Sequence, residues 1–306
     1  QDERRMYMAG AVRDIAARHI GEVALIAWPG RAFAAGLPRA SLLALLAHVV
    51  QSAADGGEPT VIRDHAIRAL MEVAPTALRS PADLQLMGAV ARAWAAAGEE
   101  ESCLLVASEA LEGWAAHGSW NEASYVLCEA LRVGALLGRL AQVQRWMDTV
   151  MPRVLEHPAT TDTSRGFVMS AAGAALLALG LAAEALSALP SHEDLSWNAW
   201  PVHLRGAVLR TRASALRELG RAEEADRVLS GMRGTWLETY AGLSRADAYA
   251  GEKPLEAAEE LRRILHASPL GHELARTLRR LAPGKEPGDA LADADVVGRV
   301  VREFRY

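Results

Sequence analysis

The stretch RASALRELGRAEEA, residues 212–225, contains the pattern that decides the fold assignment. An apolar run with helical spacing ends at Gly220, and two acidic residues, Glu223 and Glu224, open a second run. A glycine at such a place is typical of the left-handed residue that ends a helix. Acidic side chains stabilise the beginning of a helix through its dipole. The stretch therefore predicts two helices joined by a tight turn.

The same pattern recurs about every forty residues. Five glycines follow apolar runs, and successive ones are 40 to 42 residues apart: Gly57, Gly98, Gly138, Gly180 and Gly220. Residues seven positions before, five after and nine after each glycine all lack a polar side chain: Val50, Ala91, Leu131, Gly173 and Ala213; Ile62, Cys103, Val143, Ala185 and Ala225; Ala66, Ala107, Met147, Leu189 and Leu229. This period predicts helical hairpins, which must stack because one hairpin alone leaves its apolar face exposed.

Helical spacing of apolar residues extends over most of the chain, and no alternating pattern typical of a strand occurs. We therefore expect an all-α protein with a single domain, residues 1–306. Its expected parts are N-terminal helices over 1–39, hairpin repeats over 40–267 and capping helices over 268–306. The predicted helices span residues 4–20, 22–35, 40–54, 60–73, 82–97, 100–116, 120–137, 140–155, 165–179, 182–189, 201–219, 222–232, 235–250, 254–267, 270–281 and 290–304.

Residues 212–225 resemble the helix–turn–helix core of a tetratricopeptide repeat (TPR). In that family a small residue on the first helix meets an alanine on the second, and Ala213 and Ala225 stand at the matching positions. Weaker copies pair Ala91 with Cys103, Leu131 with Val143 and Gly173 with Ala185, so the resemblance covers roughly residues 40–267. The period is longer than the family's 34 residues. The aromatic residue usual two positions after the turn glycine is also missing.

Long, degenerate repeats of this kind are similar to the sensor regions of bacterial transcriptional regulators. The resemblance implies a right-handed superhelical α-solenoid of antiparallel helix hairpins. It also implies a groove that binds peptides, small ligands or partner proteins. Fold alone does not fix function, so the residues themselves must indicate the ligand.

Composition and charge exclude several classes of protein. Of the 306 residues 51% are apolar, which excludes an intrinsically disordered chain. The formal net charge is −5, whereas general nucleic-acid binders usually carry a basic excess because neutralising phosphate supplies much of their affinity. A nucleic-acid role therefore needs a local basic patch. The chain begins at Gln1 without a methionine, so we expect a processed product or a fragment.

Cysteine content and hydropathy indicate the compartment. Cys103 and Cys128 are too few for a disulfide framework and are typical of reduced thiols in a cytoplasmic protein. The longest uncharged run, residues 166–183, consists mainly of alanine, glycine and serine with several leucines, and lacks a Trp or Tyr belt. It predicts a buried helix rather than a membrane span. We expect a cytoplasmic protein that does not associate with membranes.

Motifs for catalysis, metal binding or cofactor binding are missing from the sequence. His272 and Glu273 begin a zinc-binding HExxH pattern, but Arg276 stands where the second histidine is required. There is no Walker loop, no GxGxxG after a strand and no GxSxG elbow. We therefore expect no catalytic residue, no metal, no cofactor and no enzymatic activity.

Tryptophan and arginine supply many binding hot spots. Trp197 and Trp200 lie just before Pro201 at the entrance to a helix, where we expect them to be exposed. Arginines crowd the next two helices, at positions 205, 210, 212, 217, 221, 227 and 233. The candidate partner-binding residues are Trp197, Trp200, Arg205, Arg210, Arg212 and Arg217. The structural alternatives are tryptophans that fill gaps between hairpins and arginines that form a solvated face with internal ion pairs.

Three functions compete on these observations. The first is a non-catalytic binding scaffold whose superhelical groove holds a peptide or partner-protein segment, with the sensor arm of a bacterial regulator as one setting. The second is a nucleic-acid-linked regulatory module that uses the arginine stripe of residues 205–233. The third is an enzyme with a site assembled from scattered helices. We favour the first because neither a global basic excess nor a catalytic motif is present.

Overall fold

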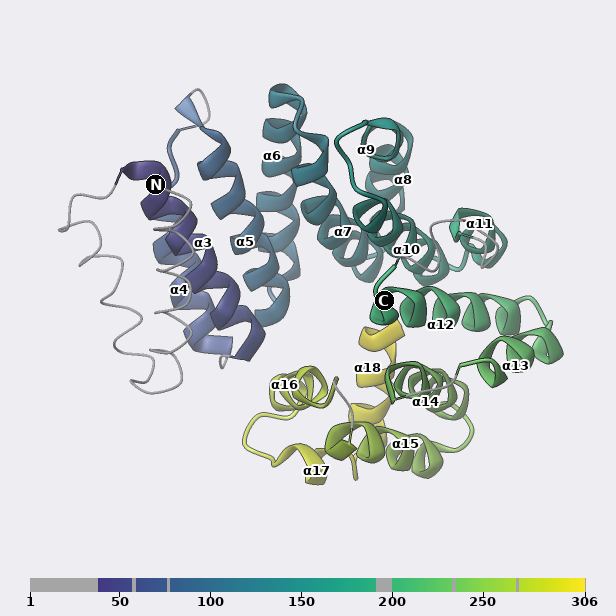
Figure 1. Cartoon of the computed structure of the whole chain (residues 1–306). Helices are drawn as coiled ribbons and strands as arrows, with labels where there is room; N and C mark the ends of the chain where they lie inside the picture. Colours follow the sequence, from purple (N-terminus) through teal and green to yellow (C-terminus); the bar gives the residue numbers. More distant parts are fainter. Residues whose placement is uncertain are drawn as a thin grey trace. The chain divides into compact units, whose positions relative to one another are not determined.

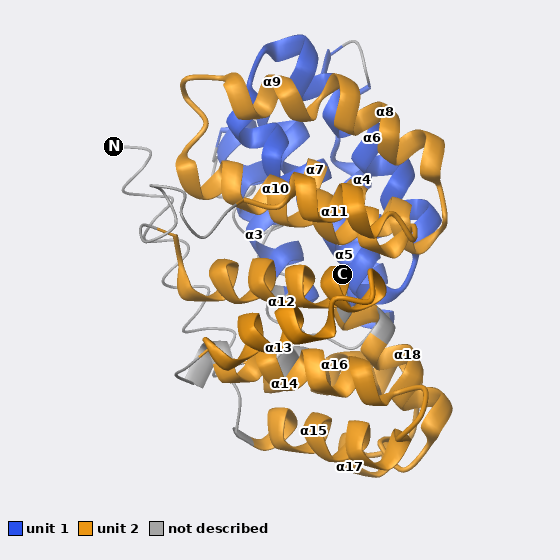
Figure 2. Ribbon diagram, turned by 90° about the vertical axis from the view of Figure 1, so that its right-hand side faces the viewer, with its two compact units in different colours: residues 1–126 blue, residues 127–306 orange. Residues whose placement is uncertain are grey.

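Figure 1 shows the computed structural model, which describes residues 38–56, 59–75, 78–190, 200–232, 235–267 and 270–305. Every regular element in those ranges is an α-helix and none is a strand, so the all-α prediction is confirmed for them. The helices predicted over 4–20 and 22–35 lie outside the described residues. Contacts between Cα atoms divide the chain into two compact units, residues 1–126 and 127–306 (Figure 2). The single domain stays a prediction.

The first unit is built from helices that contact their neighbours along the chain. α3 contacts α4 and α5, and α5 also contacts α4 and α6. The helices are α3 (Arg39–Gly56), α4 (Pro59–Met71), α5 (Pro81–Ala97), α6 (Glu100–His117) and α7 (Trp120–Leu136), which extends into the second unit.

The second unit repeats one contact pattern. α10 contacts α11 and α12, α12 contacts α13 and α14, and α14 contacts α15. The last helix, α18, closes the unit against α14, α15 and α16. Its helices are α8 (Leu140–Thr149), α9 (Met151–Glu156), α10 (Asp162–Ala178), α11 (Ala182–Ala188), α12 (Val202–Glu218), α13 (Ala222–Ser230), α14 (Thr235–Tyr249), α15 (Pro254–Ala267), α16 (Gly271–Leu281), α17 (Pro287–Ala290) and α18 (Ala294–Arg305).

Two predicted helices are interrupted. The prediction of one helix over 140–155 is wrong, because α8 ends at Thr149 and α9 begins at Met151. Pro152 has no N–H to donate to the preceding turn, so the hydrogen-bond ladder breaks there. The helix predicted over 290–304 begins only at Ala294, because Asp293 Oδ1 accepts hydrogen bonds from two backbone N–H groups of the first turn, those of Asp295 and Val296.

The predicted turn glycines end helices in the left-handed conformation. Gly98, Gly138, Gly180 and Gly220 have φ values of +77°, +65°, +77° and +73°. At the last of them, Gly220 N donates to Arg217 O at 2.9 Å and Arg221 N donates to Leu216 O at 2.8 Å. This pair of bonds is a Schellman motif and recurs at the other three glycines. The predicted helix ends are confirmed at these four positions, and Gly57 lies outside the described residues.

We expect Gly220→Ala to lower the free energy of unfolding by about 1–2 kcal/mol, because an L-residue is strained in this conformation. No atom of the described residues lies within 4 Å of the place that a Cβ would take. The cost therefore comes from the backbone alone. Urea unfolding followed by circular dichroism measures it. Gly251→Ala is the control, because Gly251 has an equally open surrounding and is not among the positive-φ glycines. An equal cost in both variants contradicts the assignment of the turn.

The repeat positions identified in the sequence are buried. Nine of the ten residues that stand seven positions before or five positions after the five turn glycines are at most 1% exposed. They are Val50, Ala91, Leu131 and Ala213 before the glycines, and Ile62, Cys103, Val143, Ala185 and Ala225 after them. Nine positions after the glycines, Ala66, Ala107 and Leu189 are buried, and Met147 and Leu229 are half-buried. The periodic positions therefore supply the interior of the helix pairs.

Close glycine–aromatic contacts join the first helices of successive pairs in the second unit. A Cβ on Gly166 of α10 would lie 2.8 Å from Trp200 Cε2, and one on Gly206 of α12 would lie 2.3 Å from Tyr240 Cδ2. The two glycines are 40 residues apart, and each aromatic residue follows its glycine by 34. The contact between α10 and the start of α12 is thus repeated between α12 and α14.

The long uncharged run lies in this packing. It includes most of α10, whose buried residues include Val168, Ala172 and Leu177, so the prediction of a buried helix is confirmed. Among the described helices, none combines the length and the hydropathy needed to span a membrane.

Candidate functional site

A pocket of about 420 Å³ opens in the second unit, where the neighbouring helices α11, α12 and α13 (Figure 1) contribute its lining. Three arginines, one glutamate, one serine and three aliphatic residues line it. They are Leu186 and Ser187 of α11, Arg212 and Leu216 of α12, Arg221 just before α13, and Glu224, Arg227 and Val228 of α13. Its volume is within the range of small-ligand sites.

The helical period places these groups on one side of each helix. Arg212 and Leu216 are four residues apart on α12, as are Glu224 and Val228 on α13, so each pair lies on one helix face. Leu216 is 5% exposed and belongs to a buried cluster with Ala213 and Ala225. Leu186 and Val228 pack against the same cluster. The apolar floor of the pocket is therefore continuous with the core of the α12–α13 hairpin.

Arg212 is half-buried in this lining. Its Nη2 donates to Pro190 O at 3.1 Å. No carboxylate of the described residues lies within ion-pair distance of it, and burial lowers the pKa of Arg212 from its usual value. A guanidinium group withdrawn from water without a counter-charge favours an anionic ligand.

The α13 side of the pocket contains an ion pair between Arg221 and Glu224 and one further cation, Arg227. Arg221 Nε and Nη2 donate to the two oxygens of Glu224 at 2.6 and 2.8 Å. These hydrogen bonds raise the pKa of Arg221 and lower the pKa of Glu224. Arg227 Nε donates to Glu223 O at 3.3 Å, and no carboxylate of the described residues forms an ion pair with Arg227. The four charges sum to two positive charges.

The candidate tryptophans do not line this pocket. Trp197 lies outside the described residues. Trp200 is 4% exposed and packs with Leu189, Leu204 and Val208, so the expected exposure of its side chain is wrong. The physical reason is Gly166, which lacks a side chain and leaves room for the indole ring on α10. This placement agrees with the alternative that a tryptophan fills a gap between hairpins.

The candidate arginines point to different surroundings. Of the four, Arg212 alone lines the pocket. Arg205 is half-buried, and its Nε has no hydrogen-bond partner in the described residues. Arg210 is 9% exposed. Arg217 donates to Ser244 O at 3.0 Å and to Asp226 at 3.3 Å. The stripe of residues 205–233 is therefore not one continuous solvated surface in its described part.

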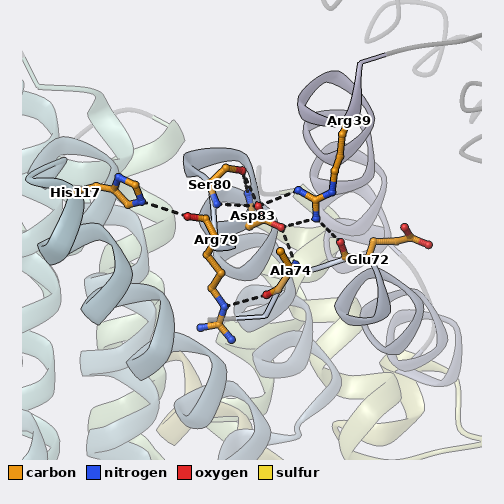
Figure 3. A network of polar contacts seen from close by, with 7 residues as sticks. All are labelled: Arg39, Glu72, Ala74, Arg79, Ser80, Asp83 and His117. Carbon is orange, nitrogen blue, oxygen red and sulfur yellow. Dashed lines mark hydrogen bonds and ion pairs between the residues drawn. The ribbon is translucent and has the colours of Figure 1, made fainter. Parts of the chain in front are cut away.

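A second polar network lies in the first unit (Figure 3). Asp83 is completely buried and accepts hydrogen bonds from Arg39 Nη1 and Nη2 at 3.0 and 2.7 Å. It also accepts from Ala74 N at 2.9 Å, Ser80 N at 2.9 Å and Ser80 Oγ at 2.6 Å. Arg39 Nη2 further donates to Glu72 O at 2.8 Å. The network ties the start of α3 to the end of α4 and the first turn of α5, so its role is structural.

Metal-ligating side chains do not gather in the described part of either unit. No group of three or more His, Cys, Asp and Glu side chains in those ranges is placed to hold a metal ion. The side chains of His272 and Glu273, which begin the incomplete HExxH pattern, lie outside the described part of the structure. The chain matches no known protein family, and a search of curated proteins finds no significant similarity.

Sequence reasoning found part of this pocket. Arg212 is among the candidate residues, and Arg221 and Arg227 belong to the arginine stripe. The α11 residues Leu186 and Ser187 were missed, because nothing in the sequence indicates that this short helix faces the arginines. The repeat offers only a general signal, since stacking of successive pairs brings the second helix of one pair, α11, against the first helix of the next, α12.

Proposed function

We propose that this protein is a non-catalytic helical-repeat binding scaffold that holds an acidic peptide or partner-protein segment. In this proposal the hairpins stack as a TPR-like, right-handed solenoid, and the pocket between α11, α12 and α13 anchors the segment. The sensor arm of a bacterial regulator is one setting in which such a scaffold acts.

The pocket is the observation that carries the proposal. It joins two arginines that lack carboxylate partners in the described residues to an aliphatic floor. This combination suits a segment in which an acidic side chain lies next to an aliphatic one. Arginine at such a place binds carboxylate oxygens with two parallel hydrogen bonds, and the aliphatic contact adds apolar burial. Ligand sites commonly combine an apolar lining with a few polar groups in this way.

Fluorescence anisotropy with defined probes tests the proposal. The probe is a labelled twelve-residue peptide that alternates glutamate and leucine. We expect saturable binding, and Arg227→Ala weakens it at least about tenfold because a hydrogen-bonded charge pair is lost. Arg227 is exposed, so its replacement leaves the core intact.

The matched control is Arg262→Ala, because Arg262 lies on α15, outside the pocket, and forms only a 3.6 Å ion pair with Glu259. This variant retains the affinity of the unmodified protein. A lysine–leucine peptide of equal length that binds equally well contradicts the proposal, as does an unchanged affinity in Arg227→Ala. Tighter binding of a single-stranded oligonucleotide, with a steep salt dependence, supports the nucleic-acid alternative instead.

A further inference from the structure

Of the three arginines that line the pocket, only one forms an ion pair with a carboxylate of the described residues. Arg221 is neutralised by Glu224 through two short hydrogen bonds. Arg212 uses Nη2 for Pro190 O, and Arg227 uses Nε for Glu223 O. Their other N–H groups have no acceptor in the described residues. Two guanidinium groups that form no ion pair in the described residues thus line one pocket of about 420 Å³, and together with the Arg221–Glu224 pair they leave it a net charge of two.

We infer that the pocket binds a phosphoryl dianion, the doubly charged group of a phosphate monoester. A single carboxylate balances one of the two positive charges, whereas a phosphoryl dianion balances both. Its oxygens also match the planar, forked donors of arginine. The aliphatic floor of Leu186, Leu216 and Val228 contacts the carbon atoms next to the ester oxygen.

This inference rests on the proposed function, because it names the group that anchors the ligand at the same pocket. The group belongs either to a phosphorylated side chain of a protein segment or to a small phosphate ester. Both sources present the same chemistry to Arg212 and Arg227, and different probes distinguish them.

The ionisation of the ligand gives the inference a pH signature. The charged groups that face the pocket are Arg212 from α12, and Arg221, Glu224 and Arg227 from α13 and the residue before it. The lining residues of α11 do not titrate. Arginine and glutamate keep their charges between about pH 5.5 and 7.5. A phosphate monoester gains its second charge near pH 6, so its affinity rises through this range, whereas that of a carboxylate stays level.

Three labelled peptides that differ at one central position test the inference. The position holds phosphoserine, glutamate or serine between leucines, and phenyl phosphate serves as competitor. We expect the phosphoserine peptide to bind roughly tenfold tighter than the glutamate peptide at about pH 7.5. The advantage shrinks toward about pH 5.5. Arg227→Gln abolishes it, Arg212→Lys reduces it while retaining the charge, and Arg262→Gln leaves it unchanged.

Each outcome supports or overturns a stated claim. Equal affinities for the phosphoserine and glutamate peptides, both lost in Arg227→Gln, overturn the dianion inference and leave the proposed scaffold standing. Direct binding of phenyl phosphate without binding of any peptide supports the dianion and overturns the peptide scaffold. An absence of binding by every probe overturns both.

Discussion

Gly206→Ala will destabilise the second unit by about 1–3 kcal/mol, the usual cost of overpacking a close contact. The added methyl group would lie 2.3 Å from Tyr240 Cδ2. Tyr240 of α14 is 8% exposed and belongs to a buried core that also includes residues of α15, α16 and α18. The ring or the helix must therefore move. The loss appears in spite of the higher helix propensity of alanine, which alone favours the variant by about 0.5–1 kcal/mol.

The effect of Gly206→Ala reverses when the ring is removed. In a Tyr240→Ala background, the added methyl group meets no ring, and helix propensity makes the same substitution stabilising. Gly298→Ala is a second control, because Gly298 lies within α18 and no atom of the described residues is within 4 Å of its added Cβ. Hydrogen exchange will show loss of protection in α12 and α14, with α3–α6 unchanged. A uniform loss along the chain contradicts the local contact.

Asp83→Ala will lower the free energy of unfolding of the first unit by about 3 kcal/mol, because a completely buried carboxylate loses its charged and backbone partners together. The variant leaves the N–H groups of Ala74 and Ser80 without their acceptor. Urea unfolding measures the loss. Asp226→Ala is the matched control, since Asp226 also pairs with an arginine but is 72% exposed, and it costs less than about 1 kcal/mol. Equal losses in the two variants contradict the structural role of the network.

The same carboxylate makes the first unit sensitive to acid. Burial acts to raise the pKa of Asp83, but hydrogen bonds from Arg39, Ser80 and Ala74 outweigh it and hold the pKa well below its usual range. Because the pKa is lower in the folded state, the contribution is complete above about pH 4 and is lost as the pH falls through the folded value. Asp83→Asn, which cannot ionise, will remove this component of acid unfolding measured by circular dichroism. An unaltered acid profile contradicts this cause.

The helices were largely predictable because the residues that end them act locally. Gly98 and Gly220 follow apolar runs, and the left-handed residue that ends a helix needs no distant partner. Gly118 also ends a helix, with φ of +67°. The helix end there was predicted, but the glycine was not identified as its cause, because it does not belong to the forty-residue series of turn glycines. The break at Pro152 was missed because the apolar spacing continues across it, although the missing N–H ends the ladder.

The candidate site was less predictable because it depends on contacts between distant residues. The burial of Trp200 depends on Gly166, 34 residues earlier. The sequence alone does not show which aromatic ring packs against a glycine within a helix. Arg212 and Arg217 are five residues apart, so the helix turns them to different neighbours, the pocket and Ser244. Sequence composition identified the arginine-rich helices, and only the packing of α11 against α12 shows which arginines share a pocket.

The most direct test of an anion-binding pocket on stacked helical hairpins is nuclear magnetic resonance of the arginine side chains. The Nε–Hε signals of Arg212 and Arg227 are assigned with single variants and followed during titration with the glutamate–leucine peptide. The account predicts saturable shifts of both signals, with the signal of Arg262 unmoved. Binding of the peptide while the signals of Arg212 and Arg227 stay in place would contradict it.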